Sequence, residues 1–214
     1  MMKLAVLVSG RGSNLQALID ACQNDDFPAE IALVLSNKAD AYGLERAKQA
    51  GIPTAVLSHQ DFEDRETFDT AMSEKIEEAG AELVCLAGFM RLLSDGFVRQ
   101  WRDRLINIHP SLLPAYKGLH VHERMIEEGA RFGGCTVHFV RPAMDEGPII
   151  IQAAVPIHPD DTPDELAARI LEQEHVIYPA AVKAIAEGRV RVHAETVGIE
   201  DHKMPEGVMI NPSV

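Results

Sequence analysis

The sequence predicts an α/β fold, a doubly wound and mostly parallel twisted sheet with helices on both faces. Short apolar runs alternate with amphipathic segments along residues 1–100, which is typical of strands joined by crossover helices. The apolar runs are continuous and lack a polar residue at every second position, as expected for parallel strands that helices cover on both faces.

Residues 1–100 form the first half of the predicted fold, a Rossmann-like, mononucleotide-binding half. Its predicted strands lie at Lys3–Ser9, Ile31–Leu35, Thr54–Leu57 and Leu83–Ala87. Helices are expected between them, over Asn14 to about Gln23, over Gly43–Ala50, and from Asp61 to about Ala79. Aliphatic and β-branched residues fill the strands, and glycine or polar residues follow most of them.

Residues 101–200 form the second half, and their pattern is less regular. We expect strands at Leu105–His109, Thr136–Val140 and Ile149–Val155, and helices over His120–Glu128 and from Pro163 to about Glu187. Proline suits the first turn of a helix, which places the start of the last one. Residues 201–214 contain proline and glycine with little apolar periodicity, so they form a peripheral tail. A length of 214 residues suits a single domain made of the two halves.

Composition restricts the partners of the chain. The formal net charge is −13 at pH 7, which argues against nucleic-acid binding because that binding requires Lys and Arg to neutralise phosphates. The first apolar run, Leu4–Val8, is too short for a signal peptide or a membrane span. Three widely spaced cysteines, Cys22, Cys85 and Cys135, predict reduced thiols in a reducing compartment. We therefore expect a cytoplasmic protein with no nucleic-acid or membrane partner.

The most informative polar pair is Asn107 and His109. In a strand, alternation places both polar side chains on one face and the interleaved isoleucines on the other. Pro110 lacks an amide hydrogen and ends the strand there. An amide beside an imidazole is useful at a carbonyl, because the amide can donate to a developing oxyanion and the imidazole can transfer a proton. The alternative is a pair of capping residues at a strand end.

The turn after the first strand, Ser9-Gly-Arg-Gly-Ser-Asn14, could hold an anion. Two glycines allow backbone N–H groups to approach a ligand closely, and the next helix presents its positive N-terminus. Leu15 replaces the third glycine of a dinucleotide motif, and no Gly-Lys-Ser/Thr of a triphosphate loop follows. A monophosphate therefore fits best. The alternative is a tight turn in which Ser13 or Asn14 caps the helix.

A third candidate is Asp145, in the segment Asp145-Glu-Gly-Pro148 between two predicted strands. An acid before glycine is usually only a turn residue, and we expect the neighbouring Glu146 to point to solvent. The histidines His109, His120, His122 and His138 raise the question of a metal site, but none shows the spacing of known metal motifs. No metal is therefore expected.

Five blocks of sequence, in order, resemble the folate-dependent formyltransferases. Asn107-x-His109-Pro-Ser-Leu-Leu-Pro114 is followed by Gly118 and by Asp145-x-Gly147-Pro148. The remaining blocks, Val8–Gln16, Ser36–Asp40, Leu86–Arg91 and Gln173–Pro179, also match the family. The resemblance covers nearly the whole chain and implies the formyltransferase fold for residues 1–214, with residues 101–200 as the catalytic and folate-binding half.

The resemblance implies a reaction and catalytic roles. The formyl group of 10-formyltetrahydrofolate, a co-substrate, would pass to the amine of glycinamide ribonucleotide (GAR) in de novo purine biosynthesis, directly and through a tetrahedral intermediate. Asn107 and protonated His109 would stabilise the oxyanion, while Asp145 and a bound water would accept the amine proton. A nearby carboxylate would favour the protonated imidazole.

The resemblance also implies binding residues. Gly12, Ser13 and Asn14 would bind the phosphate of GAR, and Glu174 would reach its glycinamide group. The folate-binding residues would be Arg65, Met90, Arg91, Leu92, Leu93 and Asn107. The sequence alone favours simpler interpretations of two of these residues. Arg65 is one charge on a solvated helix, and Glu174 lies between polar neighbours that usually mark a solvent face.

Four other functions remain as alternatives. An amino-sugar N-formyltransferase or a 10-formyltetrahydrofolate hydrolase would share the core motif. Methionyl-tRNA formyltransferases continue into a C-terminal RNA-binding domain, and this chain ends at residue 214 and is acidic. Hydrolases carry an additional N-terminal domain, whereas the first strand begins at Lys3. A catalytically inactive nucleotide-binding module is the fourth alternative. We expect a monomer or a homodimer.

Overall fold

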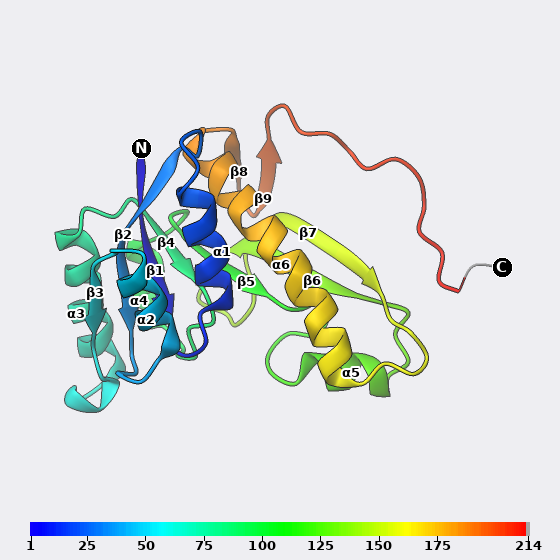
Figure 1. Cartoon of the computed structure of the whole chain (residues 1–214), viewed down its shortest axis with the longest axis horizontal. Helices are drawn as coiled ribbons and strands as arrows, with labels where there is room; N and C mark the ends of the chain where they lie inside the picture. The colour runs from blue at the N-terminus through cyan, green and yellow to red at the C-terminus, as the bar shows by residue number, and fades with distance from the viewer. Residues whose placement is uncertain (213–214) are drawn as a thin grey trace.

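A computed structural model describes residues 1–212 of the chain (Figure 1). Its main sheet has seven strands in the order β3-β2-β1-β4-β5-β6-β7. The strands are β1 (Met2–Val8), β2 (Ala29–Ser36), β3 (Thr54–Val56), β4 (Leu83–Leu86), β5 (Leu105–His109), β6 (Phe132–Phe139) and β7 (Ile149–Pro156). The first five strands in the sheet order pair in parallel, whereas β5–β6 and β6–β7 are antiparallel. The prediction of a mostly parallel sheet is confirmed.

Helices cover both faces of this sheet, as predicted. They are α1 (Ser13–Cys22), α2 (Tyr42–Gln49), α3 (Arg65–Glu78), α4 (Asp95–Gln100), α5 (Val121–Glu127) and α6 (Pro163–Ala186). One apolar core joins α1, α2, α5 and α6 to one face, and a second core joins α3 and α4 to the other. Along β1, Leu4 and Val6 enter the first core while Ala5 and Leu7 enter the second, which explains the continuous apolar run.

The structure differs from the predicted elements in three places. The helix expected from Asp61 begins instead at Arg65, after a 3₁₀ turn over His59–Asp61. Asp64 caps it, because its carboxylate accepts the Thr67 N–H at 2.8 Å. Helix α4 and the hairpin of β8 (Val190–His193) and β9 (Thr196–Ile199) were not predicted, because each is short and carries little periodicity.

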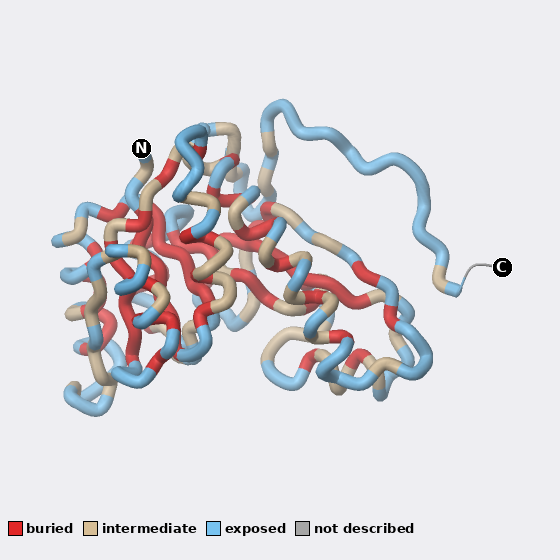
Figure 2. The backbone as a smooth tube through the Cα atoms, viewed as in Figure 1, coloured by how far each residue is buried: buried red, intermediate tan, exposed pale blue. Residues whose placement is uncertain are grey.

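Burial follows the sheet, as Figure 2 shows by the red strands and the pale blue tail. From Glu200 to Ile210 the chain is exposed, and the Asn211 amide donates to the carbonyls of Arg131 and Ile157. The tail predicted over residues 201–214 ends with two residues that lie outside the described residues. All three cysteines are free thiols, and burial raises the pKa of Cys135 to about 12. Within residues 1–212, no helix is both long and apolar enough to cross a membrane.

Candidate active site

The polar pair on β5 has the predicted parity. Ile106 and Ile108 both enter the core that contains α1 and α6, while Asn107 and His109 alternate with them. The antiparallel register with β6 sets Asn107 opposite His138 and His109 opposite Thr136. Asn107 and His109 therefore lie at the carboxyl end of β5, where the chain turns at Pro110.

Both ring nitrogens of His109 face hydrogen-bond acceptors. Its Nε2 donates to the carbonyl oxygen of Tyr116 at 2.9 Å, and its Nδ1 lies 3.4 Å from Oδ1 of Asp145. A carbonyl oxygen can only accept, and so can an ionised carboxylate. The ring thus presents one nitrogen to the Tyr116 carbonyl and the other to the Asp145 carboxylate. The His109 side chain is buried at 8% exposure and that of Asp145 is partly buried at 14%, so solvent screens their interaction little.

Asp145 lies in the loop between β6 and β7, and two contacts fix its carboxylate. Oδ2 accepts the Gly118 N–H at 2.7 Å, and Oδ1 faces His109. Asp145 has φ of 51°, a left-handed conformation that is uncommon for a residue with a side chain. Glu146 is exposed, as expected, and pairs with Lys117 at 2.7 Å. The loop thus presents the Asp145 carboxylate to His109 and the Glu146 carboxylate to solvent.

A second histidine, His138, determines how the Asn107 amide points. His138 Nδ1 donates to the carbonyl of Phe139 at 3.0 Å, so its Nε2 carries a lone pair. Asn107 Nδ2 lies 3.3 Å from that Nε2 and must donate to it. Burial lowers the pKa of His138, which keeps the ring neutral and able to accept. The second hydrogen of the Asn107 amide remains available to a ligand.

The turn after β1 leaves the N-terminus of α1 open. Gly12 is the N-cap residue with φ of 68°, and no side chain caps the helix in the described structure. The interpretation that Ser13 or Asn14 caps α1 is therefore wrong. A β-carbon on Gly12 would lie 2.7 Å from the Gly43 Cα, so the turn requires glycine there. A hollow of about 210 Å³ borders residues 9–14 and residues 87, 88 and 90.

Glu174 is buried rather than on a solvent face, so that interpretation of the sequence was wrong. Only 6% of the residue is exposed, and its Oε2 accepts from Asn14 Nδ2 at 2.6 Å. Burial raises the pKa of Glu174, while the bond from Asn14 lowers it in part. The spacing contained a signal for this burial, because Ile170, Glu174 and Tyr178 follow one another at intervals of one helical turn on the buried face of α6.

The segment Met90–Leu93 lies beside the same turn. The Met90 N–H donates to Ser9 Oγ at 2.8 Å, and that hydroxyl donates to Asn37 Oδ1 at 2.6 Å. Met90 and Leu92 are 68% and 63% exposed, so this segment presents two large apolar side chains close together at the surface. Leu93 instead packs against the second core.

The segment after Leu93 connects to α3, which carries Arg65. Asp69 is buried and accepts the Ser94 N–H at 2.5 Å, and the exposed Arg65 lies one helical turn before Asp69. A second hollow of about 450 Å³ has Asp145 and Lys117 in its wall. Among the described residues, no group of three His, Cys, Asp or Glu side chains is arranged to hold a metal ion.

A mostly parallel sheet with an Asn-His-Asp group at the end of β5 is the arrangement expected of the predicted class of group-transfer enzymes. Residues 2–182 match the formyl transferase family, to which the chain therefore belongs. It is similar to the phosphoribosylglycinamide formyltransferases of Escherichia coli and Haemophilus influenzae, with 46% identity to each. These matches cover 95% and 99% of this chain, and 96% and 100% of the relatives.

A match to a larger protein and a match to a solved structure agree with this family assignment. The trifunctional purine biosynthetic protein adenosine-3 of Drosophila melanogaster is 52% identical over 90% of this chain, although the match spans only 14% of that protein. The crystal structure of glycinamide ribonucleotide transformylase 1 from Symbiobacterium toebii superposes with a TM-score of 0.92 at 46% identity. That match covers 94% of this chain and 95% of the other.

Proposed function

We propose that this protein transfers the formyl group of 10-formyltetrahydrofolate to the amine of GAR, giving formyl-GAR and tetrahydrofolate in de novo purine biosynthesis. The observation that carries this function is the His109–Asp145 pair beside Asn107, in a chain 46% identical to a phosphoribosylglycinamide formyltransferase. The open N-terminus of α1 gives independent support, because it suits the single phosphate of the acceptor.

The proposed reaction is a direct transfer. The amine nitrogen of GAR attacks the formyl carbon, and the carbonyl electron pair moves to oxygen. The second amide hydrogen of Asn107 and the protonated ring of His109 stabilise this oxyanion. His109 Nε2 gives up its bond to Tyr116 to do so, while Asp145 holds the other ring nitrogen. The intermediate then collapses and breaks the bond to N10 of the folate.

One proton must move from the attacking amine to the leaving N10. Asp145 is the proposed route, through a water that its carboxylate orders, because it is the carboxylate in contact with His109. The proton taken from the new ammonium is returned to N10, so the folate leaves as a neutral amine. No covalent bond to the protein is needed.

The acceptor would span from the turn after β1 to α6. Gly12, Ser13 and Asn14 would bind its phosphate through backbone N–H groups and side-chain donors. Glu174 would accept from its glycinamide group, and it is already held by Asn14 at 2.6 Å. One hollow borders both this turn and Met90, so the phosphate end of the acceptor would lie beside the folate-binding segment.

The folate would lie against Met90–Leu93, whose exposed apolar side chains suit a flat ring system. Asn107 would also contact the folate, as the family resemblance implies. Arg91 Nε is buried and has no hydrogen-bond partner among the described residues, so a carboxylate of the folate would satisfy it. Arg65, exposed on α3, would add a second positive charge for such a carboxylate. These residues fit the co-substrate, and we assign no role to a metal.

The proposed cellular compartment, substrates and oligomeric state are those that the sequence predicts. We propose that the protein works in the cytoplasm on small-molecule substrates, as a monomer or a homodimer.

A panel of acceptors tests this function against its alternatives. The protein is incubated with 10-formyltetrahydrofolate and, separately, with GAR, an amino-sugar nucleotide, initiator methionyl-tRNA, or buffer alone, and products are identified by mass spectrometry. We expect formyl-GAR as the main product. Formate in buffer alone would instead indicate a hydrolase, and a formylated amino sugar or tRNA would indicate one of the other transferases. No reaction with any acceptor would indicate an inactive binding module.

A further inference from the structure

The side chain of Arg141 is buried at the start of the loop that carries Asp145. It is 8% exposed and makes three bonds: Nε to Glu195 Oε2 at 2.8 Å, Nη2 to Asp103 Oδ1 at 2.8 Å, and Nη1 to the Val140 carbonyl at 3.2 Å. A guanidinium presents its donors in a fixed fork, so bonds on several sides fix both its position and its orientation. Arg141 is therefore one of the most constrained residues of this loop.

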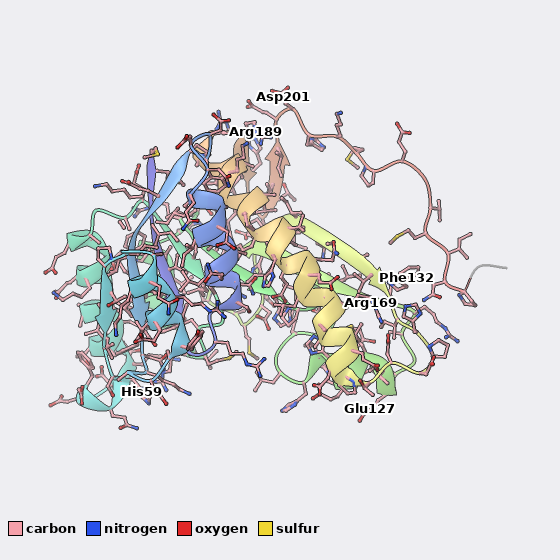
Figure 3. All side chains as sticks on the ribbon, in the orientation of Figure 1. His59, Glu127, Phe132, Arg169, Arg189 and Asp201 are labelled. Carbon is pink, nitrogen blue, oxygen red and sulfur yellow. The ribbon has the colours of Figure 1, made fainter. Side chains whose placement is uncertain are left out.

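Glu195 reaches Arg141 from the β8–β9 hairpin, which lies outside the residues that match the family. The labels Arg189 and Asp201 in Figure 3 mark where the chain enters and leaves this hairpin. Val190, Val192, Val197 and Ile199 pack its apolar side against the core, which anchors it. Glu195 occupies the turn between the strands, and its other oxygen accepts from Arg102 at 2.9 Å. The turn thus holds a carboxylate in a defined place.

The loop itself is short and constrained. Phe139 N–H donates to the Pro148 carbonyl at 2.9 Å, and Arg141 N–H donates to the Glu146 carbonyl at 3.1 Å. Asp145 lies inside this closed loop with φ of 51°. Such a conformation persists in a non-glycine residue only when its surroundings enforce it. On one side, Gly118 and Lys117 hold the loop at Asp145 and Glu146. On the other side, the Val140 N–H donates to the Leu105 carbonyl at 2.9 Å, and the Arg141 side chain adds its bonds to Glu195 and Asp103.

We propose that Arg141, held by Glu195 and Asp103, is a positioning residue that sets the place of the Asp145 carboxylate relative to His109. This inference rests on the proposed function, because it assigns Asp145 to the reaction. Arg141 does not contact Asp145 directly. Its side chain fixes the position where the loop begins. The hydrogen bond from the Arg141 N–H to the Glu146 carbonyl then restrains Glu146, the residue that follows Asp145.

The test compares two acids on the same hairpin. Glu195→Ala removes the bond to Arg141, and Glu200→Gln is the control, because within residues 1–212 the Glu200 carboxylate pairs with Arg191 at 3.7 Å and with no residue of the loop. We expect Glu195→Ala to lower kcat by about 3- to 30-fold with little change in KM for GAR, since a 1 Å displacement of a catalytic group can cost about 10²-fold. Glu195→Gln keeps an acceptor for Arg141 and should recover most of the loss. Glu200→Gln should match wild type.

A double-mutant cycle shows whether the effect passes through Arg141. In an Arg141→Met background, Glu195→Ala should have no further effect on kcat, because the contact is already absent. A Glu195→Ala variant with wild-type kcat would overturn the proposal. So would a Glu200→Gln variant with the same loss, or a full Glu195→Ala effect in the Arg141→Met background.

Hydrogen exchange tests the same contact without an activity assay and without the Arg141→Met variant. Exchange in residues 141–147 should be faster in Glu195→Ala than in wild type, and unchanged in Glu200→Gln. Equal exchange in all three proteins would overturn the positioning role. If the wild-type protein did not formylate GAR, the proposed function would fail, while this exchange comparison would still test the contact.

Discussion

Asp145 Oδ1 faces His109 Nδ1 at 3.4 Å, on the side of the ring opposite the nitrogen that donates to Tyr116. The two residues come from different elements, since His109 ends β5 and Asp145 lies in the loop between β6 and β7. A histidine between a carbonyl and a carboxylate can carry a positive charge with both hydrogens used. A positive charge on His109 would stabilise the negative oxygen that forms when the formyl group is attacked.

The first prediction concerns the three proposed catalytic residues. His109→Ala and Asp145→Ala should each lower kcat by about 10²–10⁴, the usual effect of losing a general acid or base. Asn107→Ala should lower kcat by about 10²–10³, as for one oxyanion donor. Steady-state kinetics with both substrates measures this, and KM should change less than kcat. If all three variants kept near wild-type kcat, the proposed roles would be wrong.

The second prediction concerns the turn after β1. Gly12 is unsuitable for a charge test, because any side chain there meets the Gly43 backbone. A β-carbon on Gly10 meets no atom within 4 Å, so Gly10→Asp adds a negative charge beside the phosphate at a position with open space for the β-carbon. Two like charges about 4 Å apart repel by about 4 kcal/mol at an effective dielectric of 20, an upper bound in an open hollow. GAR binding should weaken by at least about 10-fold.

Gly10→Asn is the matched control, because it has nearly the same size and no charge. It should bind GAR much more tightly than Gly10→Asp, and both variants should bind a folate analogue as wild type does. Isothermal titration of both ligands measures this. Equal GAR affinities for the Asp and Asn variants would show that no phosphate lies at this turn.

The third prediction concerns Glu174 and stability. Burial raises its pKa in the folded protein above the ordinary value of 4.5, so the folded state holds this proton more tightly than the unfolded chain does. The stability that results is fully present below the unfolded pKa and is lost as pH rises through the folded pKa. Glu174→Gln stays neutral and still accepts from Asn14, so it avoids that loss.

Thermal unfolding at two pH values tests the sign. The Tm of Glu174→Gln relative to wild type should be higher at about pH 8 than at about pH 4.5, because only wild type must ionise a buried carboxyl group at the higher pH. A Tm difference that does not vary with pH, or that varies in the opposite direction, would contradict the burial argument. GAR binding by this variant should weaken separately, since Glu174 would bind the glycinamide group.

The fourth prediction concerns His138. Burial lowers its pKa, so the ring should be neutral at about pH 6.5, where a solvated histidine is half protonated. Its hydrogen should lie on Nδ1, facing the Phe139 carbonyl, with Nε2 free to accept from Asn107. Nitrogen-15 NMR of the histidine rings distinguishes the tautomers. A hydrogen on Nε2, or a charged ring, would mean that the Asn107 amide is oriented differently.

Much of this fold is encoded locally and could be predicted. Continuous apolar runs defined the parallel strands, and alternation placed Asn107 and His109 on one face of β5. The sequence did not decide whether Ser13 and Asn14 cap α1 or bind a ligand, because both roles use the same hydroxyl and amide groups. Only the structure showed that Gly12 occupies the cap position.

Two of the missed features depend on long-range contacts. His138 supports Asn107 because of the antiparallel register between β5 and β6, which a sequence does not specify across a long connection. Glu174 is different, because its polar immediate neighbours indicate a solvent face although the residues one helical turn away are buried. Arg141 and Glu195 meet only after the β8–β9 hairpin packs on the core.

Single-turnover transfer of a labelled formyl group tests the central claim most directly. Wild type and Asp145→Asn are each saturated with GAR and 10-formyltetrahydrofolate that carries carbon-13 in the formyl group, and carbon NMR follows the label. We expect the label to appear in formyl-GAR in wild type, and at a rate lower by about 10²-fold or more in Asp145→Asn, with both ligands still bound. Label in formate, or equal rates in the two proteins, would contradict formyl transfer at the His109–Asp145 site.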